Sequence, residues 1–297
     1  MLIGAHVPTM GDYRKMAAYA AEVGCECVQV FSNSPRTWAV PPVTEKVLRQ
    51  LEEARAAGSA PGGVPFPKML VHAGYLINLA SDDPDQLARS RDSLAGELVR
   101  ACAIGADALN VHTGSSRELP RGEVAGRIAQ AVLEARELAG PCASAVPIVF
   151  ENTAGAGATY GTTMAELGAI LRRLEAFGVP EGEVGVCIDT CHAWAAGYDV
   201  ATRDGWSRLL DEVERECGGV GRLRWIHAND CKFARGSNKD RHEWIGRGAI
   251  GAEGFREMVT RPELSRVDVV VEMPGEMPEK DAVNVALLKG WRDGAGD

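Results

Sequence analysis

Histidines and carboxylates follow short apolar runs in this chain. The segment at residues 226–246, IHANDCKFARGSNKDRHEWIG, comes directly after an apolar, strand-like run and places His227 at the end of that run. Asp240 and His242 stand two positions apart. In an extended segment, both side chains therefore leave the same face and can bind one cation. This spacing alone is a weak indication of a metal site, and its weight depends on the rest of the chain.

Other apolar runs end in the same residue types. With the three residues above, the set has nine members, and the other six are His72, His112, Glu151, Asp189, His192 and Glu272. Taken singly, each is more often a hydrogen-bonded or ion-paired side chain than a metal ligand. Taken together, the four carboxylates would repel one another unless they were protonated or neutralised. A metal cluster resolves that conflict.

The ligand types indicate which metal and which reaction to expect. Imidazole and carboxylate without thiolate suit Zn²⁺, and Mn²⁺ or Fe²⁺ less well. Three divalent ions would bring six positive charges against four negative ones from the carboxylates, which leaves a pocket that attracts phosphate. Closely spaced divalent ions activate a water and stabilise the leaving oxygen in phosphodiester cleavage. The residues therefore predict a metal-dependent phosphodiesterase.

The apolar runs alternate with amphipathic helical segments along the whole chain. We expect strands at 2–7, 25–31, 69–71, 107–111, 146–150, 184–188, 223–226 and 267–271. We expect helices at 12–23, 44–57, 84–104, 121–138, 163–177, 202–217, 253–259 and 280–291. Eight such units predict an α/β fold, a closed (β/α)8 TIM barrel whose strand ends share one rim. It should form a single domain over residues 1–297, ordered to about 292 and then frayed, with the Gly/Pro-rich segment 59–67 as a loop.

Charge and composition exclude several classes of protein. The net charge of −9 argues against binding nucleic acid by bulk attraction, so a polyanion partner requires a locally positive site. The eight cysteines, including Cys187 and Cys191, have no framework spacing and are interpreted as reduced thiols of a cytoplasmic protein. The absence of a long apolar segment predicts no membrane partner. We also expect a monomer without a nucleotide cofactor.

Three segments resemble the signature segments of the endonuclease IV family of apurinic/apyrimidinic (AP) endonucleases. They are IVFENTAGAG, GVCIDTCHAWAAGYD and IHANDCKFARGSNKDRHEWIGRGAIG, and the resemblance extends from IGAHV to VVVEMPG. It implies a TIM barrel with a trinuclear zinc site that cuts double-stranded DNA 5′ of an abasic residue. The products would be a 3′ hydroxyl and a 5′ deoxyribose phosphate, and removal of 3′ blocking groups is a further expectation. The protein would be located in the cytoplasm of a bacterial-type cell and would associate with the nucleoid by binding DNA.

The resemblance assigns the nine side chains to three zinc ions, with Mn²⁺ or Fe²⁺ as an alternative at one position. One ion would be held by His72, His112 and Glu151. A second would be held by Glu151, Asp189, His227 and Glu272. The third would be held by His192, Asp240 and His242. Glu151, between two ions, would be the catalytic residue that orients or deprotonates the attacking water.

The resemblance also implies DNA contacts on the same rim. Arg36 in SPRTW and Tyr75 with Leu76 in HAGYLINL match positions that enter the duplex at the lesion. An inserted wedge keeps DNA bent, and unstacking costs least where a base is missing. The alternative is that Tyr75 and Leu76 are buried and that Arg36 is an ordinary surface charge. Asn229 and Lys232 are candidates for phosphate contacts or for supporting the ligands.

Three positions depart from the pattern of the family. Thr113 stands where proline is usual, Cys231 where serine is usual, and Met273 where threonine is common. No ligand position is lost, so fine positioning is in question and metal binding is not. His6, at the end of the first expected strand, either supports the ligands or is a core histidine.

Two other functions fit parts of the pattern. The same barrel serves metal-dependent sugar isomerases and epimerases, but one or two ions would leave His192, Asp240 and His242 without a role. A non-catalytic reader of damaged DNA would be expected to lack a bridging carboxylate, and Glu151 is present. We therefore prefer the hypothesis that the protein is an endonuclease.

Overall fold

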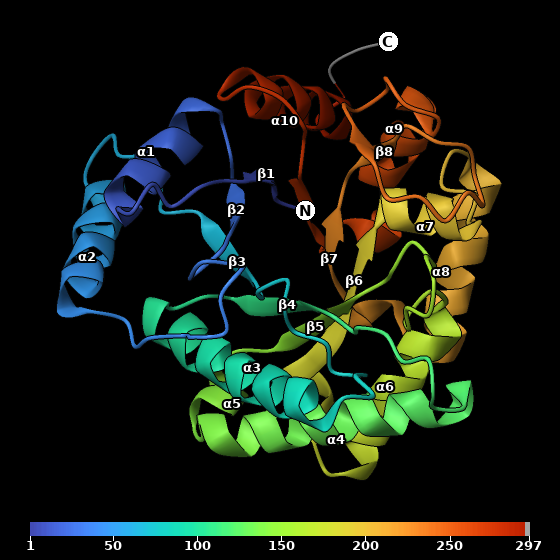
Figure 1. Ribbon diagram of the computed structural model, residues 1–297. Helices are drawn as coiled ribbons and strands as arrows, with labels where there is room; N and C mark the ends of the chain where they lie inside the picture. The colour runs from blue at the N-terminus through green and yellow to red at the C-terminus, as the bar shows by residue number, and fades with distance from the viewer. Residues whose placement is uncertain (295–297) are drawn as a thin grey trace.

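The computed structural model of this protein describes residues 1–294 as a closed barrel of parallel strands surrounded by helices (Figure 1). The order around the barrel is β1, β10, β7, β6, β5, β4, β3 and β2. The strands are β1 (Ile3–His6), β2 (Cys27–Val30), β3 (Lys68–His72), β4 (Ala108–His112), β5 (Ile148–Glu151), β6 (Val184–Asp189), β7 (Leu223–His227) and β10 (Asp268–Val271). This is the TIM barrel that the sequence predicts, and all eight strands end on one rim.

The helices lie outside the barrel. They are α1 (Tyr13–Glu22), α2 (Glu45–Ser59), α3 (Pro84–Ile104), α4 (Arg121–Ala139), α5 (Cys142–Ala145), α6 (Met164–Ala176), α7 (Thr190–Ala196), α8 (Arg203–Cys217), α9 (Gly251–Thr260) and α10 (Glu279–Arg292). Three 3-10 turns precede strands or follow helices: η1 (Glu181–Glu183), η2 (Val220–Arg222) and η3 (Pro262–Leu264). A short antiparallel pair, β8 (Asp230–Cys231) and β9 (His242–Glu243), lies above the rim.

Helix α8 shows why these segments form helices. Thr202 caps its amino end by accepting a hydrogen bond from the Gly205 amide, which satisfies one of the free donors there. Its apolar residues recur at helical spacing, and Trp206, Leu209 and Val213 are buried. Burying one such side chain stabilises the fold by about 2 kcal/mol, whereas helix propensities differ by less than about 1 kcal/mol. Packing against the barrel therefore holds this helix in place.

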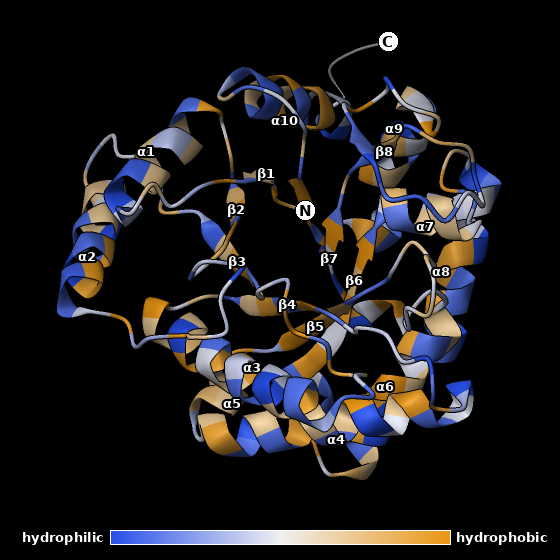
Figure 2. Ribbon diagram, in the orientation of Figure 1, coloured by the Kyte–Doolittle hydropathy of each residue, from blue (hydrophilic) through white to orange (hydrophobic). Residues whose placement is uncertain are grey.

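Two apolar layers make up the core. The larger one lies between the strands and the surrounding helices. The smaller one fills the inside of the barrel, and its members are Cys27, Leu70, Ala108, Val149, Cys187, Trp225 and Val270. Figure 2 shows mostly hydrophobic residues in the strands, while the helices mix hydrophobic and hydrophilic residues. The filled interior leaves only the two ends of the barrel for polar side chains.

The structure differs from the sequence-based prediction mainly in short elements. Helix α3 has the expected bounds, and the other expected elements shift by a few residues. Helices α5 and α7 and the β8–β9 pair were not expected, because segments of two to seven residues give no periodic signal.

Four smaller predictions concern a loop, the cysteines, membrane-spanning helices and the carboxyl-terminal tail. The 60–67 segment is a loop between α2 and β3, and all eight cysteines are free thiols. None of the described helices is long and apolar enough to span a bilayer. The expected frayed tail falls largely on residues 295–297, which lie outside the described residues.

Candidate metal centre

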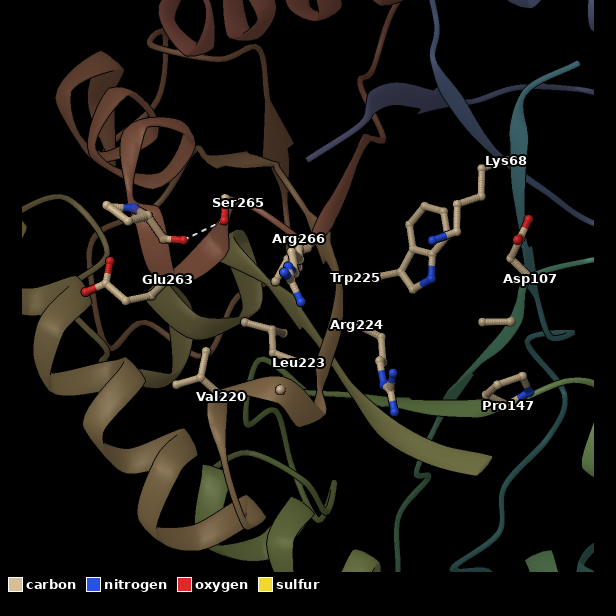
Figure 3. Close-up of a pocket in the computed structure, with 14 residues that line it drawn as sticks. Lys68, Asp107, Pro147, Val220, Leu223, Arg224, Trp225, Glu263, Ser265 and Arg266 are labelled. Atoms are coloured by element: carbon tan, nitrogen blue, oxygen red, sulfur yellow. Dashed lines mark hydrogen bonds between the residues drawn. The ribbon is translucent and has the colours of Figure 1, made fainter. Parts of the chain in front are cut away.

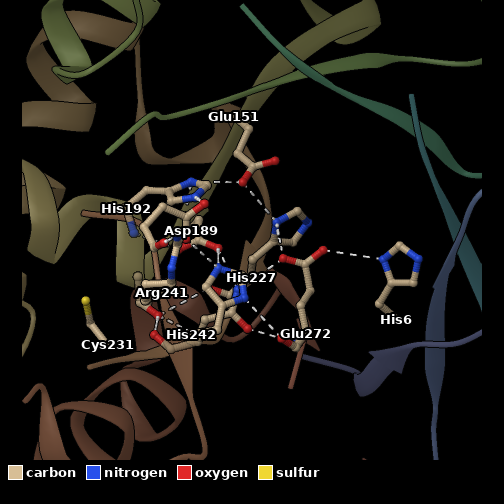
Figure 4. A network of polar contacts seen from close by, with 12 residues as sticks. His6, Glu151, Asp189, His192, His227, Cys231, Arg241, His242 and Glu272 are labelled. Carbon is tan, nitrogen blue, oxygen red and sulfur yellow. Dashed lines mark hydrogen bonds and ion pairs between the residues drawn. The ribbon is translucent and has the colours of Figure 1, made fainter. Parts of the chain in front are cut away.

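All nine candidate ligands meet at the carboxyl-terminal rim of the barrel. Figure 4 shows, among them, Glu151, Asp189, His192, His227, His242 and Glu272. Six lie at the end of a strand or immediately after one: His72, His112, Glu151, Asp189, His227 and Glu272. His192 lies on α7, Asp240 in the loop before β9, and His242 at the start of β9. Seven of the nine line one pocket of about 560 Å³, and the fully buried Asp189 and His227 do not line it.

Glu151 is the centre of the cluster because each of its two oxygens faces a different pair of histidines. Oε2 lies 3.6 Å from His72 Nε2 and 3.4 Å from His112 Nε2. Oε1 lies 3.1 Å from His192 Nδ1 and 3.3 Å from His227 Nδ1. A carboxylate placed in this way can bind two cations at once.

The ligand atoms fall into groups that could each hold an ion. Atoms of His72, His112 and Glu151 lie within 4.8 Å of one another. The same limit holds for Asp189, His227 and Glu272, and for His192, Asp240 and His242. The first and third groups have the members that the resemblance implies, whereas the second lacks Glu151. Glu151 instead also forms a group with Asp189 and His192, so it is a potential link between the groups.

Asp189 connects the second and third groups through the backbone. It caps α7, where its Oδ1 accepts a hydrogen bond from the His192 amide at 2.8 Å. His192 lies on this short helix, which the sequence does not predict. The cap explains the difference, because a strand-terminal aspartate can start a helix as well as bind a metal. Asp189 therefore helps to set the direction of His192.

Asp240 and His242 approach each other as their spacing predicts. His242 Nε2 lies 3.2 Å from Asp240 Oδ1, and His192 Nε2 lies 3.2 Å from Asp240 Oδ2. The β8–β9 pair holds this loop over the rim, with Cys231 opposite His242 in the register. An extended segment was considered for both residues. The structure places only His242 in a strand, and Asp240 lies in the loop before it.

The imidazoles are oriented as metal ligands usually are. His72 Nδ1 lies 2.7 Å from the Ala73 carbonyl oxygen, and His242 Nδ1 lies 3.0 Å from the Glu272 carbonyl oxygen. His227 Nε2 lies 2.8 Å from the side-chain oxygen of Gln29. A proton on each of these nitrogens leaves the other ring nitrogen free to bind a cation.

Two of these other nitrogens have no hydrogen-bond partner among residues 1–294. They are His227 Nδ1 and His242 Nε2, and both are buried. Each nevertheless faces carboxylate oxygens, at 3.3 Å from Glu151 and at 3.2 Å from Asp240. Buried polar atoms are normally hydrogen-bonded, and these two are arranged as ligands around a cation would be. The residues present therefore fit a metal cluster.

Buried amides hold the carboxylates in place. The side-chain nitrogen of Asn110 donates to Glu151 Oε2 at 2.6 Å, and that of Gln29 donates to Glu272 Oε1 at 2.6 Å. Asn229 donates to Asp189 Oδ2 at 2.6 Å. Sequence reasoning missed Asn110 and Gln29. A signal was present, since each is a single amide inside an apolar strand.

Asn229 and His6 receive roles that the sequence left open. Asn229 is fully buried, so it supports Asp189 and Glu272 and does not reach a DNA phosphate. His6 Nδ1 lies 3.4 Å from Glu272 Oε1 and 2.8 Å from Gln29 Nε2. His6 therefore supports a ligand from the first strand.

The cluster shifts the pKa values of its members in opposite directions. Burial lowers the pKa of His112 to about 4, which keeps this imidazole neutral and able to bind a metal. Burial opposes ionisation of Glu151 as well, but the facing imidazoles, His112 and His227 foremost, hold its pKa well below the usual range. Burial also acts against protonation of His242, but Asp240 and Asp189 raise its pKa to about 9. A metal at His242 must therefore displace a proton.

A thiol also lies near the cluster. Cys191, which the sequence analysis interprets only as a reduced thiol, is within ligand distance of Asp189 and His242. Its hydrogen bond to Cys231, and then burial, raise its pKa. Cys191 is fully buried, so it packs beside the cluster.

The residues expected to contact DNA are mostly exposed on the same rim. Tyr75 is 59% exposed, and its ring centre lies 5.2 Å from that of Phe31. Tyr75 and the half-buried Leu76 line the pocket. Arg36 and Lys232 are exposed, and Lys232 Nζ lies 3.7 Å from Glu243. Burial of both Tyr75 and Leu76, the alternative considered for them, does not occur.

The three departures from the family pattern are all buried. Thr113 is buried and donates to the Tyr160 carbonyl oxygen. Cys231 and Met273 are also buried. None of the three belongs to a ligand group in the described residues.

A parallel barrel with clustered histidines and carboxylates at its carboxyl-terminal rim defines a class of metal-dependent enzymes that includes hydrolases and isomerases. Residues 17–292 match the family described as the xylose isomerase-like TIM barrel. "Probable endonuclease 4" of Halorhodospira halophila is 40% identical over 292 residues, which cover 98% of this chain and 94% of that protein. The chain belongs to the endonuclease IV family.

Two solved structures compare with the chain over nearly its whole length. Endonuclease IV from Thermus thermophilus superimposes with a TM-score of 0.83 and 30% identity, covering 99% of this chain and 100% of that one. A D-tagatose 3-epimerase-like protein superimposes with a TM-score of 0.71 and 18% identity, covering 99% and 98%. The second likeness shows only that the fold is shared with epimerases. The comparisons therefore favour the endonuclease over the epimerase.

Proposed function

We propose that this chain cleaves the phosphodiester bond 5′ of abasic sites in double-stranded DNA, using three metal ions. The observation that supports this most is the position of Glu151, whose two oxygens each face two histidines inside a cluster of nine potential ligands. Membership of the endonuclease IV family supplies the reaction class. The proposal also includes removal of 3′ blocking groups, a monomeric state and a cytoplasmic location.

The donor set favours zinc. Neutral imidazoles and carboxylates would hold the three ions. Mn²⁺ or Fe²⁺ at one position remains part of the proposal. When bound, such ions supply the positive charge that acidifies a water and stabilises the leaving oxygen.

The residues of the chain position the ions and the attacking water. The carboxylate of Glu151, which lies between two pairs of histidines, would orient that water or accept its proton. Asn110 fixes the carboxylate of Glu151 from behind, and Gln29 with Asn229 fixes that of Glu272. These hydrogen bonds exist before substrate binds, so less reorganisation is needed during the reaction.

The rim also offers groups for recognition of the lesion. The exposed ring of Tyr75 and the adjacent Leu76 project from the loop after β3 beside the metal pocket. Inserted at an abasic site, they would fill the space of the missing base. Arg36 would enter the duplex beside them, and Lys232 would contact a phosphate.

The sugar isomerase alternative gains nothing from the site. His192, Asp240 and His242 form a complete third group with atoms within 4.8 Å, which a site for one or two ions does not require. A non-catalytic reader is disfavoured because Glu151 is present and held by Asn110 at 2.6 Å.

The test is incision of a duplex that carries one abasic analogue, together with elemental analysis of the protein. Metal-loaded protein should cut the damaged duplex on the 5′ side and leave an undamaged duplex intact, and prolonged chelation should abolish cutting. The expected content is three ions per chain, as the ligand groups suggest. Intact damaged DNA with fully loaded protein would refute the proposal, and a single bound ion would refute its three-metal form.

A further inference from the structure

The barrel has a second cavity at the end opposite the metal centre (Figure 3). Its volume is about 610 Å³, which is the size of a small-molecule site. It is lined by residues at the starts of β3, β4 and β7 and just before β5 and β10. We name it the lower mouth, and its cationic residues are Lys68, Arg224 and Arg266. None of its residues belongs to the metal cluster.

A β-bulge aims Arg224 into the lower mouth. Leu223 and Trp225 have partners on β6, but the register skips Arg224 between them. Adjacent strand residues normally point to opposite faces, yet Arg224 and Trp225 both line the cavity. Bulges re-aim side chains in this way and are common at the rims of barrels. Gly185 on β6 provides the room, because a Cβ there would lie 2.8 Å from Arg224 Cγ.

Two guanidinium groups of the lower mouth have no anionic partner among residues 1–294. The Nε atom of Arg224 is buried and makes no hydrogen bond. Neither Arg224 nor the exposed Arg266 forms an ion pair with a described carboxylate. Arg224 is half-buried and Arg266 is exposed, so both guanidinium groups keep N–H donors that a bound anion could use.

The nearby carboxylates are already engaged. Asp268 Oδ2 lies 2.6 Å from Lys68 Nζ, and Glu263 pairs with Arg261 at 3.7 Å. Asp107 accepts a hydrogen bond from the backbone of β3 at 2.8 Å. The pairing within the chain therefore uses Lys68 and leaves the two guanidinium groups of the lower mouth free.

We propose that the lower mouth binds a phosphate-bearing small molecule, whose phosphoryl oxygens are held by Arg224 and Arg266. The planar fork of a guanidinium group matches a phosphate and can donate two parallel hydrogen bonds to it. The same phosphoryl chemistry also occurs in the DNA backbone, and the experiment separates these two sources. The inference does not depend on the proposed nuclease activity, because the two sites share no residue.

The test is a titration of metal-loaded, ¹⁵N-labelled protein with inorganic phosphate in a phosphate-free buffer. The reporter is the Nε–H resonance of Arg224, identified by its absence from the spectrum of Arg224→Gln. Phosphate at the metal centre does not touch this atom, so the reporter follows the lower mouth alone. We expect a saturable shift, and Arg266→Gln should weaken it roughly tenfold by removing one charge-assisted hydrogen-bond donor.

The matched control is Arg215→Gln, which removes an exposed guanidinium near the end of α8. It should leave the phosphate affinity unchanged, and Arg266→Gln should incise abasic DNA at the wild-type rate. No saturable shift up to about 50 mM phosphate would overturn the proposal, since weaker binding would not be specific. Equal weakening by the control would overturn it as well.

A second titration with a short undamaged duplex separates the sources. A shift of the Arg224 resonance with phosphate and not with the duplex supports a small-molecule ligand. A shift with the duplex and not with phosphate overturns the small-molecule proposal in favour of DNA backbone.

Discussion

The two ends of the barrel use charge in opposite ways, although the same strands lead to both. At the carboxyl-terminal rim, four carboxylates and five histidines face one another, and buried amides such as Asn110 hold them. At the lower mouth, two guanidinium groups stand without an anionic partner in the described chain. The rim is therefore built for cations and the lower mouth for an anion. Charged side chains can therefore lie at either end of a filled barrel. At the rim, buried amides hold the charged groups in place.

The largest effect is expected at the rim. Glu151→Gln keeps the shape of the side chain but removes the charge that faces four histidines, so incision of abasic DNA should fall by about 10³-fold or more. The thermal unfolding profile by circular dichroism should remain cooperative. Glu97→Gln, at a buried glutamate bound to Ser32 at 2.7 Å, is the matched control and should retain activity. Wild-type rates in Glu151→Gln would show that the bridging assignment is wrong.

The supporting network should matter next. Gln29→Met fills the same space but loses the hydrogen bonds to His227 and Glu272. Metal affinity, measured as bound metal after dialysis against graded chelator, should fall by about 10- to 100-fold. Gln50→Met, at a buried glutamine on α2, is the control and should not change metal content. Unchanged affinity in Gln29→Met would mean that the rim does not need its buried amides.

The lesion wedge should affect DNA and leave the metals in place. Tyr75→Ala removes an exposed ring, and the affinity for an abasic duplex should fall by about tenfold, as loss of one stacking aromatic does. Metal content should stay at the wild-type value. Phe177→Ala, at an exposed aromatic after α6, serves as the control. Equal affinity of the wild-type and Tyr75→Ala proteins would remove the wedge role.

The smallest effect concerns a phosphate contact. Lys232→Gln should weaken DNA binding by a similar factor for damaged and undamaged duplexes and lower the salt slope by about 0.9. The slope of log affinity against log salt measures this. Arg215→Gln, on the far end of α8, should leave the slope unchanged. For a protein of net charge −9, we expect the wild-type affinity for DNA to depend only weakly on salt. A steep salt dependence would contradict the proposal that shape and metal ions, more than a basic surface, hold the DNA.

The sequence predicts more of the fold than of the metal site. The alternation of apolar runs and amphipathic helices predicts the barrel, because each strand must be buried on both faces and each helix on one. The strand-terminal residues such as His72, His112 and Glu151 follow from the same alternation, since parallel strands in a barrel end on one rim. Helix α7, which carries His192, was not predicted, because its seven residues and its aspartate cap look like a loop.

The sequence by itself determined which residue types could bind metal, the order of the strands and helices, and the end of the barrel at which the ligands gather. Only the tertiary structure decided which amide supports which carboxylate, as with Gln29 and Glu272, which lie 243 positions apart. It also decided that Asn229 is buried and that a bulge turns Arg224 into the lower mouth. The physical reason is that periodicity encodes which face of an element is buried, whereas contacts between distant elements depend on register and packing, which no local pattern contains.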